Sequence, residues 1–209
     1  MTNPPAIPDF APAVGPSRRD ILQGALVAGG ALMAGGILAG APPGRASSGA
    51  SPAQDARVLN LALLLEYVEA AFYAEARAKN RLTGELRQYV AVVGDHEQQH
   101  VAFLKKTLGS NARKPPRLRF GQATTDPDKF VAAAGALEDT VVAAYNGQAT
   151  NLSPPALAAA ARIVSVEARH AAWIRAIAGE PPASRATDPA KTQTEVMAAL
   201  RKTGFLRSA

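Results

Sequence analysis

Glu97-Gln98-Gln99-His100 and Glu167-Ala168-Arg169-His170 repeat one spacing, a glutamate followed three residues later by a histidine, and they use two of the chain's three histidines. Residues three apart lie on the same face of an α-helix, so each pair can present a carboxylate and an imidazole to one metal ion. In a four-helix bundle, two such pairs and one glutamate from each of the two other helices form a two-metal site. The repeated spacing therefore predicts a helical bundle with metal ligands in its interior.

The composition restricts the chemistry of such a site. The 209-residue chain is 47% hydrophobic and contains no cysteine. The lack of cysteine excludes disulfides, thiolate zinc sites, rubredoxin-type iron centres and catalytic thiols. Any metal ion must therefore be bound through nitrogen and oxygen.

The formal net charge of +6 is a modest excess of basic residues. The densest basic run, residues 113–119, lies in a proline-broken stretch between two helical patterns. A single aromatic residue, Phe120, flanks it, and no recognition helix accompanies it. We interpret the run as a solvated loop, with a phosphate-binding patch as the alternative, and we expect no nucleic-acid partner.

Residues 1–50 have the composition of an export segment. A pair of arginines precedes an uncharged stretch of about twenty residues, the layout of a twin-arginine signal that begins with Ser17, Arg18 and Arg19. We expect the twin-arginine machinery to export the folded chain to the periplasm or the extracellular space. Small residues at 48–50 predict cleavage before Ser51, with 39–41 as the weaker site. An uncleaved segment that anchors the chain in a membrane is the alternative.

Four long segments carry apolar residues at intervals of three and four, with glycine or proline near their ends. They predict helices over residues 55–80, 85–108, 127–149 and 154–178. A shorter amphipathic segment, 189–202, predicts a fifth helix that caps the bundle, with a partner or a membrane surface as the alternative target. We therefore predict an all-α protein in three parts: the export segment 1–50, a four-helix bundle 51–180 and a C-terminal extension 181–209.

The predicted helices also form two related pairs. Leu65-Glu66 is followed by Tyr73, seven residues after the glutamate. Leu137-Glu138 is followed by Tyr145 at the same offset. Each of these helices precedes a Glu-x-x-His helix at nearly the same distance, as an internal duplication would produce. The duplication favours Glu66 over its neighbour Glu69 as the single glutamate of its helix.

Four segments together resemble the ferritin-like superfamily, and within it the ferritin-like proteins related to plant desiccation-related proteins. They are LEYVEAAFY at 65–73, HEQQH at 96–100, LEDTVVAAY at 137–145 and VEARH at 166–170. The resemblance covers most of residues 55–178 and implies a ferritin-like four-helix bundle with a carboxylate-bridged pair of iron or manganese ions. The ligands that it implies are Glu66, Glu97, His100, Glu138, Glu167 and His170. Glu69, Tyr73 and Tyr145 would lie beside them, the tyrosines as hydrogen-bond donors or as core aromatics.

The resemblance also implies redox chemistry. Carboxylates with two imidazoles suit iron or manganese, whereas zinc is usually bound by fewer carboxylates. The superfamily suggests oxidation of Fe(II), or consumption of peroxide, during oxidative or desiccation stress. Without cysteine a reductive cycle needs an external electron donor, and storage of mineral iron is not expected. The sequence leaves the oligomeric state open, with a dimer as one candidate.

Two other functions compete with this one. His96-Glu97-Gln98-Gln99-His100 also spells the HExxH signature of zinc metallopeptidases. That function requires a third ligand, yet residues 101–125 contain no Glu, Asp or His. It also leaves the second Glu-x-x-His pair unexplained, so we expect His96 to face solvent or to cap the site. The other competitor is a metal-free bundle that acts as a scaffold or stress-interaction protein.

Overall fold

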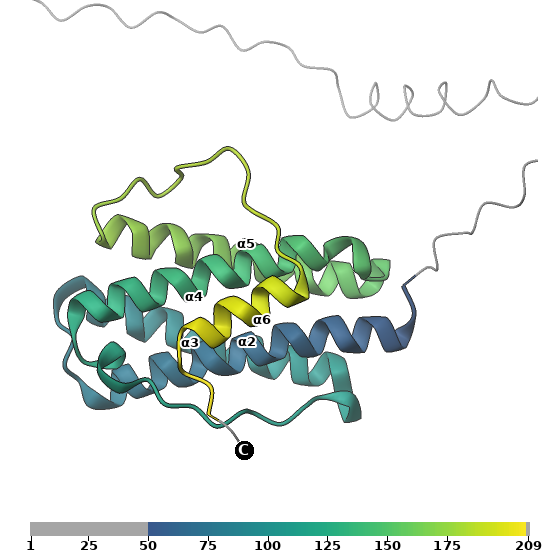
Figure 1. Ribbon diagram of the computed structural model, residues 1–209, viewed down its shortest axis with the longest axis horizontal. Coiled ribbons are helices and arrows are strands. Elements are labelled where there is room, and N and C mark those ends of the chain that lie inside the picture. Colours follow the sequence, from purple (N-terminus) through teal and green to yellow (C-terminus); the bar gives the residue numbers. More distant parts are fainter. Residues whose placement is uncertain (1–49, 208–209) are drawn as a thin grey trace, which may run out of the picture. The chain divides into compact units, whose positions relative to one another are not determined.

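The structure, a computed structural model, describes residues 50–207 and contains five α-helices and no strand within that range (Figure 1). The helices are α2 (Pro52–Lys79), α3 (Gly84–Leu108), α4 (Pro127–Gln148), α5 (Pro154–Ile177) and α6 (Gln193–Lys202). The four long helices closely match the predicted ones. The expected all-α bundle with a short C-terminal helix is therefore confirmed.

Local sequence sets the ends of the long helices. The side chain of Ser51 accepts a hydrogen bond from the backbone of Gln54 at the start of α2, and Asp126 accepts one from Lys129 at the start of α4. In both helices a proline follows the capping residue, where its missing N–H is not needed. α3 ends at Gly109, whose φ of +55° is a conformation that glycine adopts readily.

α6 is shorter than the segment 189–202 that the sequence predicts. Thr192 and Glu195 form a capping box, in which each side chain accepts a hydrogen bond from the backbone N–H of the other residue. The helix therefore begins at Gln193, and the residues before it form an irregular connection.

Ser153 occupies the N-cap position of α5, but its side chain makes no capping hydrogen bond. Its backbone N–H and its hydroxyl donate instead to the two carboxylate oxygens of Asp55 in α2. Hydrogen bonds to an ionised carboxylate are among the stronger ones in proteins. The serine therefore fixes the start of α5 against α2 rather than terminating its own helix.

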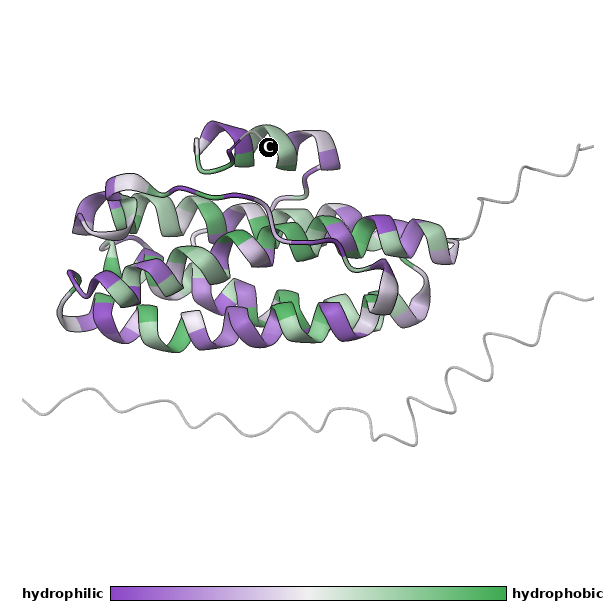
Figure 2. Ribbon diagram, turned by 90° about the horizontal axis from the view of Figure 1, so that it is seen from below, coloured by the Kyte–Doolittle hydropathy of each residue, from purple (hydrophilic) through white to green (hydrophobic). Residues whose placement is uncertain are grey.

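The four long helices pack as two hairpins. α2 packs mainly on α3 and α4 mainly on α5, and the hairpins meet through α2 with α4 and α3 with α5. Hydrophobic and hydrophilic residues alternate along the helices (Figure 2), and the hydrophobic faces form one core. Its fully buried large side chains include Phe72, Tyr73, Tyr89, Leu104, Phe130 and Ile174.

The connection between α3 and α4 runs alongside α2. The amide of Asn60 donates to the carbonyl of Asn111 at the start of this connection, and its oxygen accepts from the N–H of Arg113. Near its end, Nζ of Lys79 donates to the hydroxyl of Thr124. The chain therefore returns along α2 and begins α4 at the end of the bundle where α2 ends. The basic side chains of the connection are exposed, as expected of a solvated loop.

α6 lies across the face formed by α2 and α4 and packs on α4 (Figure 1). Its apolar residues Val196 and Leu200 are buried, as the amphipathic pattern predicts. The connection to α6 passes closely over Gly147, because the N–H of Lys191 donates to the carbonyl of Ala143 at 2.9 Å. The last helix is therefore an additional layer on the bundle.

No helix within residues 50–207 has the length and hydrophobicity that crossing a membrane would require. The residues predicted to form the export signal, Ser17, Arg18 and Arg19, lie outside the described residues. Export therefore stays a prediction.

Candidate metal centre

The six residues that the sequence predicts as ligands meet in the centre of the bundle. α2 contributes Glu66, α3 Glu97 and His100, α4 Glu138, and α5 Glu167 and His170. The four glutamate side chains are fully buried, and the two imidazoles are nearly so. Four buried carboxylates in an apolar core would be strongly unfavourable unless cations offset their charge.

The six residues form two groups that share two members. Glu66 and His100 lie in one group and Glu138 and His170 in the other, while Glu97 and Glu167 belong to both. Within each group the candidate ligand atoms all lie within 4.8 Å of one another. The shared residues come from the Glu-x-x-His helices, so the spacing that repeats in the sequence places one carboxylate of each pair between the two groups.

The first group surrounds Nδ1 of His100. This nitrogen lies 3.3 Å from Oε2 of Glu66 and 3.2 Å from Oε2 of Glu97. It also lies 2.7 Å from Oε1 of Glu167. Neighbouring ligands on an ion with bonds of about 2.1 Å and angles of about 90° stand about 3 Å apart, so the spacing suits a metal ion.

The second group surrounds Nδ1 of His170 and uses the other oxygens of the shared carboxylates. The nitrogen lies 3.0 Å from Oε1 of Glu97 and 3.4 Å from Oε2 of Glu167. Oε2 of Glu138 lies 3.6 Å away. Each shared carboxylate thus turns one oxygen toward each imidazole, which is the arrangement of a bridging ligand.

Many of these atoms lack an aligned hydrogen-bond partner. They are Oε2 of Glu66, Oε1 of Glu97, Oε2 of Glu138, both oxygens of Glu167 and Nδ1 of His170. A buried polar atom without a partner costs free energy, and such atoms in a native structure call for an ion or a water molecule. Within the two groups these oxygen and nitrogen atoms lie close together without forming hydrogen bonds to one another, so metal ions bound by them would suit the arrangement.

Burial and the close approach of the carboxylates also shift the pKa values of the ligand residues. Burial and the nearby carboxylate of Glu66 raise the pKa of Glu167 to about 7. Burial alone would lower the pKa of His100, but the carboxylates of Glu167, Glu66 and Glu97 favour its charged form and raise the pKa to about 12. Burial also opposes the charge on His170, and Glu138, Glu167 and Glu97 likewise raise its pKa to about 12. The carboxylates thus favour positive charge at both imidazoles.

Tyr73 and Tyr145 hydrogen-bond to the single glutamates, but each to the glutamate of the other hairpin. The hydroxyl of Tyr73 in α2 donates to Oε1 of Glu138 in α4. The hydroxyl of Tyr145 in α4 donates to Oε1 of Glu66 in α2 at 2.8 Å. Hydrogen bonding to the ligands is one of the two roles that the sequence predicts for these tyrosines. In the structure, each of these hydrogen bonds links α2 to α4. Each bond leaves the other carboxylate oxygen turned toward an imidazole.

Tyr89 is a third tyrosine at the site, and it was not among the residues predicted from the sequence. Its hydroxyl donates to Oε1 of Glu138 at 3.1 Å and lies 3.3 Å from that of Tyr73. Tyr89 precedes Glu97 by eight residues, which places both on one face of α3. That periodicity could have identified it, but the equivalent position before Glu167 is an alanine, so the duplication gave no signal.

Glu69 lies beside the centre without belonging to either group. Its side chain is fully buried, and neither of its oxygens has a hydrogen-bond partner. Burial raises its pKa well above the ordinary value, and the charge of Glu138 adds to the effect. On α2, Glu66 lies beside the imidazole of His100, and Glu69 does not join either group.

His96 does not join either group of ligand atoms. It is half-buried, and its Nδ1 lies 2.9 Å from Nε2 of His170, the nitrogen that points away from the carboxylates. Burial and the neighbouring His170 lower the pKa of His96. His96 thus caps the site next to His170, and the two histidines of the HExxH sequence do not face one common ligand group.

Comparison with known proteins agrees with this geometry. No curated protein matches the chain. The family model described as a ferritin-like domain matches residues 54–180, which include all four long helices but for the first two residues of α2. That match covers more than half of the chain and contains all six residues of the two ligand groups. With its four-helix bundle and a buried glutamate and histidine cluster that could bind metal, the chain belongs to the ferritin-like domain family.

Proposed function

We propose that the protein binds two iron or manganese ions, one in each group of ligand atoms, with Glu97 and Glu167 as bridging carboxylates. The observation that carries the proposal is that each of these two glutamates turns one oxygen toward each imidazole. Four carboxylates would balance the charge of two divalent ions, which is favourable in an apolar core. Oxygen ligands with two imidazoles favour iron or manganese over zinc.

We further propose that the centre oxidises Fe(II) or consumes peroxide. A pair of iron or manganese ions supplies redox chemistry when bound. The chain's own residues hold the ions, orient the terminal glutamates through Tyr73 and Tyr145, and exclude bulk water by burying all four carboxylates. His100 has 11% of its side chain exposed, more than His170 at 4%, which suggests that small reactants enter beside it.

The cellular setting is a prediction from the N-terminal segment. A chain that folds and loads metal before export would suit the twin-arginine machinery, and the centre would then act in the periplasm or outside the cell. Protection against oxidative or desiccation stress fits such a location.

Metal stoichiometry tests the proposal most directly. The full-length chain, loaded with Fe(II) or Mn(II) without oxygen and freed of excess metal, should contain about two ions per chain by elemental analysis. The double variant Glu97→Gln, Glu167→Gln should lose both ions, because both groups share these residues. Glu66→Gln should retain about one ion, because Glu138 and His170 remain. Glu180→Gln, on the exposed surface, is the matched control and should bind as the parent does.

Three outcomes would contradict the proposal. A parent chain without near-stoichiometric metal would favour the metal-free scaffold. One zinc ion that persists in Glu167→Gln and disappears in His96→Ala would favour the metallopeptidase. Two ions without any oxidation of Fe(II) and without any loss of added peroxide would remove the redox function and leave only metal binding.

A further inference from the structure

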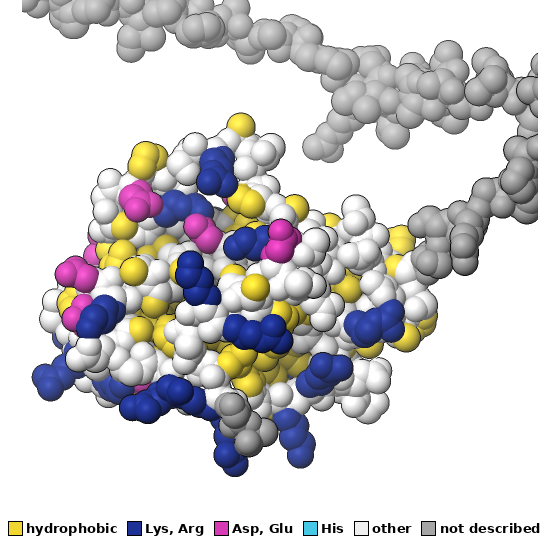
Figure 3. Space-filling model, viewed as in Figure 1, with side chains coloured by type: hydrophobic (Ala, Val, Ile, Leu, Met, Phe, Trp, Pro, Cys, Tyr) yellow, Lys and Arg dark blue, Asp and Glu magenta, His cyan; other side chains and the backbone are white. Residues whose placement is uncertain are grey.

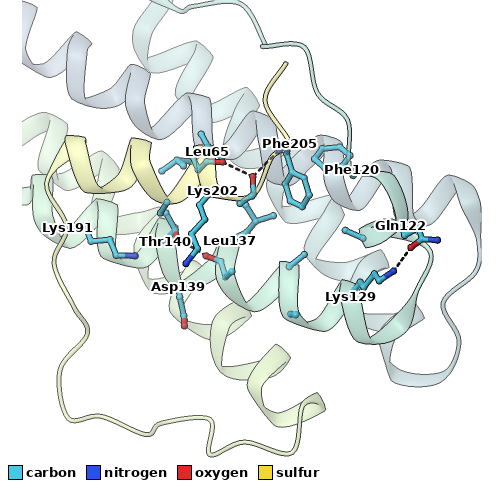
Figure 4. A pocket seen from close by; sticks show the side chains of 17 residues that line it. Leu65, Phe120, Gln122, Lys129, Leu137, Asp139, Thr140, Lys191, Lys202 and Phe205 are labelled. Atoms are coloured by element: carbon cyan, nitrogen blue, oxygen red, sulfur yellow. Dashed lines mark hydrogen bonds between the residues drawn. The ribbon is translucent and has the colours of Figure 1, made fainter. Parts of the chain in front are cut away.

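A groove lies between α4, α6 and the connection before α4, and none of the six candidate metal ligands lines it. Its volume is about 790 Å³, within the range of about 300–1,000 Å³ that small-molecule sites occupy. We call it the α4–α6 groove, and its apolar lining includes Leu65, Phe120, Ala136, Leu137, Leu200 and Phe205. Figure 4 shows how these side chains lie around it.

The walls of the groove are fixed by the fold. Phe120, in the connection before α4, packs edge-on against Phe205 in the C-terminal tail, with 5.1 Å between ring centroids. The carbonyl of Phe205 accepts a hydrogen bond from the backbone of Arg119 at 3.0 Å. α4 contributes small side chains at 132, 133 and 136, which leave room between these aromatic walls and the helix. Packing and hydrogen bonding therefore fix the walls of the α4–α6 groove.

The floor of the groove lies directly behind the metal centre. Leu65 and Leu137 are almost fully buried, and each precedes one of the single glutamates, Glu66 and Glu138. On an α-helix, neighbouring residues point about 100° apart. The leucines therefore face the groove while the glutamates face the imidazoles, and the groove itself has an apolar floor.

The ends of the groove are cationic. Figure 4 shows Lys191 and Lys202 at one end, near Thr140 and Asp139, and Lys129 at the other. Lys191 and Lys202 form no ion pair within residues 50–207. The carboxylate of Asp139 is already paired with Arg175. On the same face of the molecule, hydrophobic side chains are exposed between Lys and Arg side chains (Figure 3).

We propose that the α4–α6 groove binds a single-chain amphipathic ligand with an anionic head, of the fatty-acid class. The apolar tail lies over Leu65 and Leu137, and the head group lies between the ammonium groups of Lys191 and Lys202. Apolar walls with cationic groups at the ends, two of them at the same end, match such a ligand in both hydrophobicity and charge. The net charge of +6 also favours the approach of an anion.

A second copy of the chain fits the groove less well. In a two-fold dimer the same patch meets itself, so Lys191 and Lys202 of both copies would lie near one another. Like charges brought together at an interface are unfavourable. Charge complementarity therefore favours a small anion over self-association.

Binding of dodecanoate to the full-length chain, measured by calorimetry below the micelle concentration, tests the proposal. We expect one saturable site per chain. Octanoate should bind more weakly by a factor on the order of 100, because it buries four fewer methylene groups. Dodecyltrimethylammonium, which has the same tail and a cationic head, should show no saturable binding.

Variants separate the groove from the rest of the chain. Ala136→Trp fills the groove from an exposed helix position and should abolish saturable binding. Ala161→Trp, at an exposed position of α5 away from the groove, is its control. Lys191→Glu, Lys202→Glu should weaken binding by about tenfold or more, since two attractions become repulsions. Lys105→Glu, Lys106→Glu on α3 is the control for charge and should not change the affinity.

Several results would overturn the proposal: no saturable binding, equal binding of the cationic surfactant, or binding that survives Ala136→Trp. The last would place the ligand elsewhere, for example on the hydrophobic N-terminal segment. Dimerisation of the ligand-free chain that Ala136→Trp prevents would instead make a second copy the occupant. Because the groove does not include the metal ligands, metal stoichiometry in the same variants shows independently whether the centre is intact.

Discussion

Glu97 and Glu167 stand between the two groups of ligand atoms, one on α3 and one on α5. Each has two carboxylate oxygens, one directed toward each group. A glutamine at the same position would have only one oxygen and no charge, so it could not serve both groups in this way. The terminal residues Glu66 and Glu138 serve one group each. Loss of the shared carboxylates should therefore affect both ions, whereas loss of a terminal carboxylate should affect one. Metal stoichiometry can distinguish these two results.

Tyr145→Phe tests whether the tyrosines orient the ligands. The change keeps the buried ring and removes only the hydroxyl that donates to Glu66 at 2.8 Å. A ligand whose hydrogen-bonding partner is removed typically loses about 10-fold to 100-fold in metal affinity. We expect one of the two ions to bind about tenfold more weakly in a competition titration with a chelator.

Tyr67→Phe is the matched control for this change. Tyr67 lies on α2 next to Glu66, but its hydroxyl donates to the carbonyl of Arg113 at the surface. It should leave both affinities unchanged. An equal loss in both variants, or no loss in Tyr145→Phe, would mean that the hydroxyl of Tyr145 does not act through Glu66.

Helical periodicity and the repeated sequence pattern were enough to predict which glutamates and histidines would lie close together. The two Glu-x-x-His pairs, Glu66 and Glu138 are all brought together. The partners of Tyr73 and Tyr145 were not predictable, because which hairpin each hydroxyl reaches depends on how the hairpins pack. The hydrogen bond from Tyr89 to Glu138 and the contact of His96 with His170 depend on the same packing of the hairpins.

Among the elements, the last connection and α6 depend on close contact with α4. A Cβ on residue 147 would lie 2.0 Å from the carbonyl oxygen of Lys191, far closer than atoms tolerate. Gly147→Ala should therefore displace this connection and destabilise the fold by about 1–3 kcal/mol. Urea unfolding measures the loss, and limited proteolysis should cleave faster within residues 180–192.

Gly135→Ala in the same helix is the control. A Cβ there meets only Cγ2 of Ile174 at 4.0 Å, an ordinary contact. Because glycine is unfavourable inside a helix, this change should stabilise the protein by about 0.5–1 kcal/mol. Equal stability of the two variants would show that the connection does not need to approach α4 so closely.

Helix positions were more predictable than the connections between them. Apolar periodicity with glycine or proline near the ends located all four long helices, although α2 begins at Pro52, three residues before the predicted start. The route of the connection before α4 is set instead by Asn60, whose side chain binds a segment about fifty residues away in sequence. Ser153 shows the same limit, since it hydrogen-bonds to Asp55 in another helix instead of capping α5. The walls of the α4–α6 groove likewise depend on contacts of Phe120 and Arg119 with Phe205, which is far away in sequence, so no local pattern predicted the groove.

For the whole molecule, the metal-free protein should lose stability as pH rises. The pKa of Glu167 is raised to about 7 in the folded state, so the folded chain holds more protons than the unfolded chain between about pH 4.5 and 7. The raised pKa values of His100 and His170, about 12, continue the effect from about pH 6.5 upward. The thermal midpoint of the metal-free chain should therefore fall by an amount on the order of 5 °C between pH 5 and 8.

The metal-loaded protein should respond in the opposite direction. Metal ions bind the deprotonated ligands, so loading releases protons and becomes stronger as pH rises. Scanning calorimetry of both forms across this pH range is the measurement. A metal-free chain that grows more stable toward pH 8 would contradict the arrangement of charges in the core.

The crossed bonds of Tyr73 to Glu138 and of Tyr145 to Glu66 have a consequence for the origin of the protein. Either helical hairpin alone has half of the centre and a tyrosine without its carboxylate. An ancestor with a single hairpin would have needed a second copy of itself to complete the site. Fusion of the two genes would then have made the pairing permanent, after which each half could change separately. On that account, Tyr89 and Glu69, whose equivalents in the second half are Ala159 and Val141, would mark positions at which the two halves have diverged.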